Sequence, residues 1–407
     1  MNIGILTYFD ICNFGANLQA LSTYNYFLNR GYHPIMINWM TESLEKKYKT
    51  SVPALQYESH FKFCRDHFKM TNVCRTSKDV AEAIKHFNIA AVVVGSDAVA
   101  QHHTFFSRII FPSSRIVSFV PSKEDTTCPN PFWGTFNQYL ETSIPIVMMS
   151  VSNQDTNYKI MRPSERKIMK ECAQKMKFIS ARDMRTSAMF SYVTGGEIKP
   201  TITPDPVFAF NYNVDQQPSE QDIRSRYDIR GKYILVCLQK TRNISNEWIQ
   251  KFKEICLLKG YQPIAFPLPG GISFEHTFEK VIDVPLDPMD WYSLIKYSSG
   301  YVGCNMHPIV VSLHNGVPCF SFDNYGVAHF RMFIEKKSSK IYHILNEFGV
   351  LCNRVRSRGI FQRTPSPEDV FNKLEQFDRG RVLDFSKKYI DRYKQMMENI
   401  EAVLIHS

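Results

Sequence analysis

Apolar runs and amphipathic segments alternate along this chain of 407 residues. Residues 2–8 form an apolar run typical of a strand, and the following segment repeats apolar residues at helical spacing as far as Gly31. Residues 34–39 are apolar again. The opening therefore reads strand, helix, strand, which predicts a parallel sheet with right-handed crossovers.

The alternation continues in two series. The first series predicts further strands and helices as far as residue 181. The polar segment after Asp205-Pro206, which runs to about residue 230, is interpreted as a linker joined to an N-terminal helix of the second domain. The second series begins with a strand at 233–238 and ends with a strand at 317–322. We predict an α/β protein of two doubly wound Rossmann-like domains facing each other across a cleft, with an N-terminal domain over 1–210, a C-terminal domain over 211–365, and helices over 366–407 that cross back to the first domain.

One long stretch, residues 101–143, shows neither the helical nor the strand spacing of apolar residues and is rich in Pro, Phe and polar residues. Connections in compact α/β domains are usually shorter. Two interpretations stay open: a loop that confers specificity, and a peripheral insertion without functional consequence.

The composition is that of a globular protein, with 44% hydrophobic residues and a net charge of +10. This charge suits polyanionic partners, anionic membranes or phosphorylated small molecules. The Lys and Arg residues do not gather in the stripes or fingers typical of nucleic-acid binders, so we expect no nucleic-acid function.

The ten cysteines include no C-x-x-C pair and no regular disulfide spacing. No signal-peptide pattern opens the chain, and no run reaches the ~18 apolar residues of a membrane span. We therefore expect a protein of the reducing cytoplasm.

Candidate ligand-binding residues follow the predicted strands, because ligands of parallel sheets bind at the carboxyl ends of the strands. In the first such loop, Asn13, Gly15 and Asn17 lie between a strand and a helix whose free N–H groups favour anions. The single glycine does not make a dinucleotide fingerprint. A purely structural Asn/Gly turn is the alternative.

In the second loop, Gly95, Ser96 and Asp97 end a very apolar strand. Asp97 could orient or deprotonate a sugar hydroxyl, and Ser96 could donate to an oxyanion. Alternatively, both side chains only cap the next segment.

In the third loop, Arg182 follows a strand and precedes a helix. An arginine that points into an interdomain cleft is suited to bidentate recognition of carboxylate or phosphate. We expect the neighbouring Asp183 to pair with it or to cap the helix, and a surface salt bridge is the alternative for Arg182.

The fourth loop joins an apolar strand to an apolar helix through Asn305 and His307. Asn305 has the chemistry of an N-cap, and Pro308 is tolerated only in the first turn of a helix. The positive helix end disfavours an imidazolium, so we expect His307 to be mostly neutral near pH 7 until a phosphate dianion binds. A histidine with only a structural role is the alternative.

No H-E-x-x-H motif, zinc spacing, Walker loop or G-x-S-x-G elbow occurs in the chain. We expect neither a metal site nor a cofactor.

Taken in order, these loops resemble the polysaccharide pyruvyl transferase family over about residues 1–350. The matching stretches are GILTYFDICNFGANLQA, GYHPIMINW, VVVGSDAV, ISARD, DPVF, NMHPIVVSLHNGVPCF and SSKIYHILNEFGV. The resemblance implies a fold similar to GT-B glycosyltransferases, with the acceptor side in the first domain and the donor side in the second.

The resemblance also implies a reaction. The enolpyruvyl unit of phosphoenolpyruvate would be transferred to two hydroxyls of a hexose, in a surface polysaccharide or its lipid-linked precursor, to form a cyclic ketal and release phosphate. Such chemistry assigns His307 as general acid or phosphate ligand, Arg182 as an anion clamp and Asp97 as base or acceptor ligand. Lys240 and Arg242, just after a strand of the second domain, are secondary candidates. A lipid-linked acceptor and the net charge also suggest peripheral contact with an anionic membrane at its cytoplasmic face.

The chain departs from the family at its most informative motif. Asn305-Met306-His307-Pro308 stands where a Ser-Phe-His-Gly pattern is common, and the aromatic residue expected after the VGSD segment is replaced by Val99-Ala100-Gln101. A changed acceptor or a loss of pyruvyl transfer would explain these departures. Two other functions therefore stay open: a GT-B glycosyltransferase that uses a nucleotide sugar, and a non-catalytic sugar-binding relative.

Overall fold

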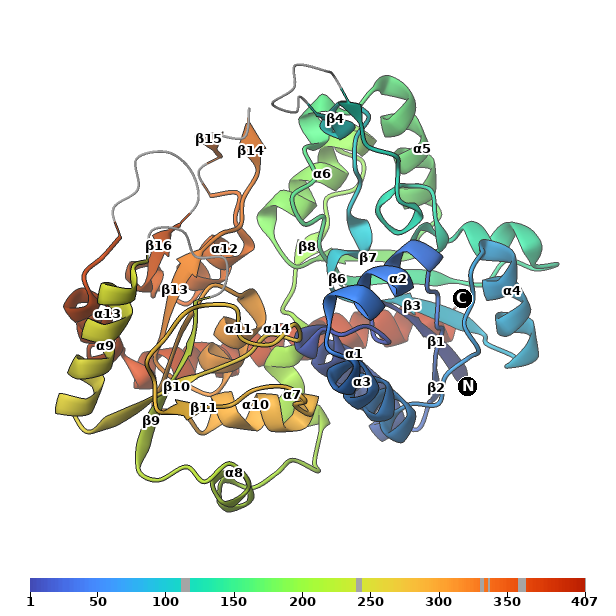
Figure 1. Ribbon diagram of the computed structural model, residues 1–407. Helices are drawn as coiled ribbons and strands as arrows, with labels where there is room; N and C mark the ends of the chain where they lie inside the picture. Colours follow the sequence, from blue (N-terminus) through green and yellow to red (C-terminus); the bar gives the residue numbers. More distant parts are fainter. Residues whose placement is uncertain (111–117, 239–243, 330–332, 336, 358–363, 407) are drawn as a thin grey trace.

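Two parallel sheets of six strands each form the core of the molecule (Figure 1). The computed structural model describes residues 1–407 except 111–117, 239–243, 330–332, 336, 358–363 and 407. Alternate residues of the central strands enter different hydrophobic clusters, so both faces of each sheet are buried. The prediction of two doubly wound Rossmann-like domains is confirmed.

The first domain has the strand order β2-β1-β3-β6-β7-β8. Its strands are β1 (Asn2–Leu6), β2 (His33–Met36), β3 (Ala91–Val94), β6 (Ile146–Val151), β7 (Phe178–Ala181) and β8 (Thr201–Ile202). Its helices are α1 (Phe14–Asn29), α2 (Glu42–Ser51), α3 (Ala54–His67), α4 (Ser77–His86), α5 (Pro163–Gln174) and α6 (Met184–Thr194). All four residues of β3 are buried, which explains why this strand reads as a continuous apolar run.

The second domain has the strand order β11-β10-β9-β12-β13-β16. Its strands are β9 (Lys232–Cys237), β10 (Tyr261–Ala265), β11 (Lys280–Val281), β12 (Gly300–Gly303), β13 (Cys319–Asp323) and β16 (Arg354–Arg356). Its helices are α9 (Asn246–Leu258), α10 (Pro288–Lys296), α11 (Met306–His314), α12 (Lys340–Glu347) and α13 (Pro367–Glu375).

Short antiparallel pairs are added to each domain. They are β4 (Ile109–Ile110) with β5 (Ser118–Phe119), and β14 (Ala328–His329) with β15 (Phe333–Ile334). The first pair belongs to the stretch 101–143, whose other described residues form 3₁₀ turns and irregular chain.

In each sheet the strand order reverses direction between two neighbouring strands. This switch point lies between β1 and β3 in the first sheet and between β9 and β12 in the second. The crevice outside a switch point is where open α/β sheets bind ligands. The loops after β1, β3 and β12 carry three of the four predicted sets of site residues.

The segment that joins the domains contains the predicted helix and, before it, apolar residues that pack in the core. It begins with a 3₁₀ turn (Pro206–Ala209), followed by α7 (Phe210–Asn213) and α8 (Glu220–Arg226). Phe208 is fully buried and packs on Phe348 and Tyr389, with ring centroids 5.3 and 4.9 Å away. The apolar residues at the start of this segment therefore belong to the core between the domains.

The last helix, α14 (Arg379–His406), runs from the second domain to the first (Figure 1). Near its start, Ser386 Oγ donates to the carbonyl of His314 in α11 at 3.4 Å. Near its end, Glu401 accepts a hydrogen bond of 2.6 Å from the Tyr26 hydroxyl of α1. None of the helices among the described residues is both long enough and apolar enough to cross a membrane.

Candidate active site

A cavity of about 410 Å³ lies where the carboxyl ends of the two sheets face each other. The first domain contributes Asn13 and Asp97 from its switch point, and the second contributes His307, Tyr325 and Lys340. The stretch 101–143 also lines it, through Gln101, His103, Lys123, Asp125 and Thr126. This position favours the interpretation of that stretch as a functional loop over a peripheral insertion.

The two domains meet at His307. This residue lies in the first turn of α11, and its ring covers Gly15 in the first turn of α1. A Cβ atom at position 15 would lie 2.0 Å from Cγ of the imidazole. Gly15 is therefore required for close approach, and it brings two positive helix ends to one point.

The buried ring of His307 is held in its neutral form. Burial lowers the pKa of His307 to about 4, although the carboxylates of Asp205 and Asp97 oppose this shift. The Nε2 atom is buried and has no hydrogen-bond partner among the described residues. The expectation of a neutral histidine agrees with this pKa, but the main cause is burial.

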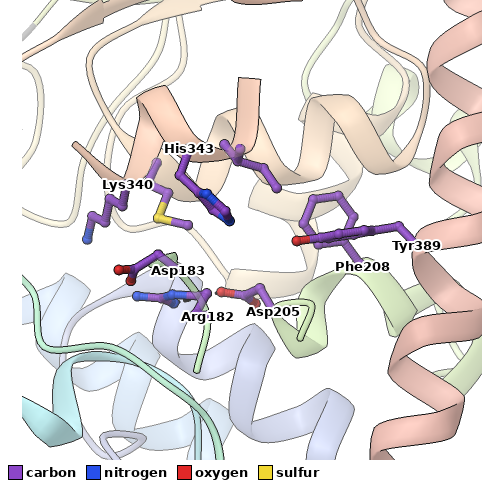
Figure 2. Close-up of a pocket in the computed structure, with 9 residues that line it drawn as sticks. Arg182, Asp183, Asp205, Phe208, Lys340, His343 and Tyr389 are labelled. Atoms are coloured by element: carbon purple, nitrogen blue, oxygen red, sulfur yellow. Dashed lines mark hydrogen bonds and ion pairs between the residues drawn. The ribbon is translucent and has the colours of Figure 1, made fainter. Parts of the chain in front are cut away.

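Arg182 forms a buried ion pair behind the cavity. Its side chain is 3% exposed, and Nη1 donates to Oδ2 of Asp205, which is 1% exposed, at 2.7 Å. Burial would raise the pKa of Asp205, but the charge of Arg182, together with hydrogen bonds from Arg182 and from the N–H of Val207, outweighs this effect and holds the pKa below its usual value. Figure 2 shows Arg182 and Asp205 side by side, facing residues of α12.

Arg182 faces the second domain, as expected, but it does not line the large cavity. It lines instead a void of only about 10 Å³, together with Met306 and Lys340 of the second domain. Asp183, the neighbouring residue, caps α6 by accepting from the N–H of Thr186 at 2.8 Å. Arg182 is thus positioned to orient other charged groups, while its Nη2 atom has no hydrogen bond among the described residues.

Asp97 is one of the groups that Arg182 faces, with Nη2 3.9 Å from Oδ1. Its backbone has φ +83° and ψ −168°, a region that residues other than glycine rarely adopt. Such strain costs of order 1–3 kcal/mol and tends to occur at functional sites. The N–H of Ala98 donates to Oδ1 at 2.8 Å, which fixes the carboxylate at the cavity wall.

The other residues of the first two loops have mainly structural contacts. Ser96 Oγ donates to the carbonyl of Ser150 at 3.0 Å, and a Cβ atom at Gly95 would lie 2.9 Å from Cβ of Thr7. Asn17 is fully buried and donates to the carbonyl of Phe9 at 2.6 Å. These three residues therefore support the loops, and their side chains do not line the cavity.

Asn13 and Asn305 occupy the N-cap positions of α1 and α11 but make different contacts. Asn13 lines the cavity and accepts from the N–H groups of Gly15 and Ala16 at 3.1 and 3.3 Å, so it caps α1. Asn305 occupies the corresponding position before α11, but its side chain makes no capping hydrogen bond. The capping that we predicted for Asn305 is wrong, and its amide leaves the first turn of α11 open to another partner.

Lys340 is a cation that our sequence analysis missed. It begins α12 directly after the capping residue Ser339, and its ammonium lies 3.1 Å from Gln154 Oε1 and 4.5 Å from the centre of the Tyr325 ring. Burial, followed by the charge of Arg182, lowers the pKa of Lys340 to about 8. The segment SSKIYHILNEFGV contained the signal, because Ser339 marks a helix start beside a basic residue.

Lys240 and Arg242 lie outside the described residues. Two acidic residues that could hold the ribose of a nucleotide sugar in the second domain already have ionic partners. Asp323 accepts from Arg354 Nε at 2.6 Å, and Glu335 accepts from Arg185 Nη1 at 3.0 Å. Within the described part of the chain, no group of three or more His, Cys, Asp or Glu residues is arranged to hold a metal ion.

The family model for polysaccharide pyruvyl transferases matches residues 13–325, which is most of the chain. The chain belongs to this family. The matched region includes Asn13, Asp97 and His307, and it includes both members of the buried Arg182–Asp205 ion pair. Lys340 lies beyond the end of the matched region.

Solved structures confirm the GT-B type of fold for this family member. A ugt transferase from Siraitia grosvenorii in complex with UDP has a TM-score of 0.51 and 11% identity, with 100% of each chain covered. The UDP-GlcNAc 2-epimerase from Methanocaldococcus jannaschii has a TM-score of 0.50 and 12% identity, over 93% of this chain and 92% of that chain. At these identities the likeness concerns the fold alone. No curated protein matches the sequence.

Histidine NMR tests the state of His307. We expect the ring to remain neutral from pH 8 to pH 5, because burial lowers its pKa to about 4. Asp97→Asn should lower this pKa further, since the Asp97 carboxylate opposes the shift. The pKa of a free histidine side chain is near 6.5, so between pH 6.5 and pH 4 the unfolded state binds a proton at His307 that the folded state does not bind. The free energy of unfolding should therefore decrease as the pH falls through this range. His307→Gln assigns the signal, and titration near 6.5 would contradict the buried environment.

Chemical denaturation tests the buried ion pair. Arg182→Met should lower the free energy of unfolding by about 3–5 kcal/mol, because it leaves the Asp205 carboxylate buried without its cation. The matched control is Arg230→Met, since the Arg230 side chain is 91% exposed, and it should change stability by less than about 0.5 kcal/mol. Equal effects of the two substitutions would show that the pair does not stabilise the fold.

Proposed function

We propose that this transferase moves the enolpyruvyl group of phosphoenolpyruvate onto two hydroxyls of a hexose, in a polysaccharide or its lipid-linked precursor. The observation that carries the proposal is the meeting of cationic and proton-transferring groups at one cavity. His307 and Lys340 from the second domain and Asp97 from the first all line it. Phosphoenolpyruvate carries a carboxylate and a phosphate. The cation of Lys340 and the proton-transferring groups of His307 and Asp97 are complementary to this anionic donor.

The anionic donor is assigned to the second-domain side of the cavity. The uncapped first turn of α11 offers backbone N–H groups, and Lys340 offers an ammonium whose pKa of about 8 keeps it mostly charged at pH 7. A bound phosphate dianion would raise the pKa of His307 and turn this residue into a proton donor. Arg182 acts through its carboxylate partners and is a positioning residue.

The hexose is assigned to the first-domain side. Asp97 accepts the proton of the attacking hydroxyl, and its strained backbone and the Ala98 N–H hold it in place. A cavity of about 410 Å³ is within the range of small-ligand sites. Gln101, His103 and Lys123 of the functional loop supply polar groups for the rest of an oligosaccharide.

The reaction balances in two steps without an oxidant or reductant. In the first step the hydroxyl oxygen bonds to C2 of the enolpyruvyl group, Asp97 takes the hydroxyl proton, and C3 receives this proton to become a methyl group. In the second step another hydroxyl bonds to C2 and gives its proton to Asp97, the bond between C2 and the phosphate oxygen breaks, and phosphate leaves with the electron pair while His307 supplies a proton. The proton held by Asp97 then returns to His307, so both residues regain their starting states. The products are a cyclic ketal and inorganic phosphate.

Ligand binding and turnover test the proposal. Phosphoenolpyruvate should raise the melting temperature, and a synthetic hexoside should trigger phosphate release. Lys340→Met should weaken phosphoenolpyruvate binding at least about tenfold, because a charged hydrogen bond is lost. His307→Gln should bind the donor but lower phosphate release by about 10²–10⁴-fold.

Lys388→Met, on the exposed side of α14, is the control and should match the wild type in both measurements. Stabilisation by a nucleotide sugar and not by phosphoenolpyruvate would refute the proposal and favour a glycosyltransferase. Donor binding without phosphate release from any member of a hexoside panel would favour the non-catalytic relative.

A further inference from the structure

Exposed and half-buried aromatic rings and arginines form a stripe on the first domain, and none of them lines the cavity. It consists of residues of the stretch 101–143 and of α5 and α6, and we call it the aromatic–arginine stripe: Phe105, Phe106, Arg108, Phe119, Arg162, Arg166 and Tyr192. Phe106 and Phe119 are 52% and 46% exposed. Figure 1 shows β4 beside α5 and α6 at one end of this domain.

Five members of the stripe contact one another. The Phe105 ring lies 5.5 Å from that of Phe106 and 5.3 Å from that of Phe119. Arginines cover the faces of the rings: Cζ of Arg108 is 4.4 Å from the Phe119 centroid, and Cζ of Arg162 is 4.4 Å from that of Phe105.

One helical turn further along α5, the stripe continues. Arg166 lies 5.6 Å from the centre of the Tyr192 ring. Arg162 and Arg166 are four residues apart, so both lie on the same side of α5. The stripe therefore extends along the helix and does not end at the β4–β5 pair.

The charge around the stripe is strongly positive. Residues 159–177, which include α5, carry seven Lys or Arg residues against two Glu residues. The Glu165 carboxylate is 10% exposed and accepts from the backbone N–H groups of Phe105 and Arg162, so it is engaged inside the fold. Aromatic rings beside surplus cations are the composition of proteins that bind at the interface of anionic bilayers.

The stripe is close to the mouth of the cavity. Phe106 follows the cavity residue His103 by three positions, and Val120, which is 38% exposed, precedes the cavity residue Lys123 by three. Three residues of chain span at most roughly 11 Å. A surface held at the stripe would therefore lie near the cavity.

We propose that the aromatic–arginine stripe docks the protein on an anionic lipid bilayer. The exposed ring edges enter the interfacial region, and the guanidinium groups bind lipid phosphates. A saccharide chain is a poorer fit, because arginines already cover the faces of Phe105 and Phe119 on which sugars would stack. The docking does not depend on the proposed reaction, although a lipid-linked acceptor would explain why the stripe lies beside the cavity.

Vesicle flotation without substrates tests this proposal. The wild-type protein should float with phosphatidylglycerol–phosphatidylcholine vesicles, bind pure phosphatidylcholine vesicles less, and be released by high salt. Phe106→Ser/Phe119→Ser and Arg108→Gln/Arg162→Gln should each lower the partition coefficient at least about tenfold. The melting temperature of each variant, and its phosphate release with a water-soluble hexoside, should stay at the wild-type level.

The matched control is Phe61→Ser/Arg65→Gln on α3. There Arg65 Cζ lies 4.5 Å from the centroid of Phe61, a ring that is 38% exposed, and we expect wild-type flotation. Equal flotation of the stripe variants and the wild type, or no flotation of the wild type, would overturn the proposal. Loss of binding to a soluble polysaccharide instead would assign the stripe to the acceptor chain. Flotation without any turnover would refute the proposed reaction and leave the docking surface intact.

Discussion

The site depends on one buried ion pair, that of Arg182 with Asp205. Two charges this deeply buried are tolerated only because they neutralise each other, and their hydrogen bond of 2.7 Å fixes both. The pair lies at the carboxyl end of the first sheet and faces three groups that line or border the cavity: Asp97, His307 and Lys340. The charge of Arg182 favours the neutral forms of His307 and Lys340, while the Asp97 carboxylate favours the charged forms of both and the Asp205 carboxylate favours the charged form of His307. The balance of these charges sets the protonation of the site before any substrate arrives.

The second constraint is the contact between the domains. Because the ring of His307 rests on Gly15, the candidate site exists only when α1 and α11 approach each other end to end. The buried Phe208 and the crossing helix α14 hold this arrangement by packing against both domains. Pro308 is compatible with this arrangement, since it lies in the first turn of α11, where its missing N–H is not needed.

Much of the fold can be predicted from the spacing of apolar residues along the chain, but the detailed contacts of the site cannot. The alternation of strands and helices was sufficient to predict both sheets and the loops that carry Asn13, Asp97 and His307. The helices α2 and α3 were not predicted, because α2 buries only Leu44 and α3 few residues, so neither shows a strong apolar period. The engagement of Arg182 with Asp205 and the burial of Lys340 result from packing between segments far apart in the chain. Local sequence therefore identified Arg182 as important but could not show that it pairs with Asp205.

The most direct test of the account follows the fate of C2 of the donor. The protein is incubated with phosphoenolpyruvate labelled with ¹³C at C2 and with a hexoside acceptor, and the products are read by NMR. The account predicts that the label appears in the acceptor as a carbon bonded to two sugar oxygens, with one phosphate released for each ketal formed, and that His307→Gln abolishes both signals together. Recovery of the label only as free pyruvate, or as unchanged donor with every acceptor, would contradict it.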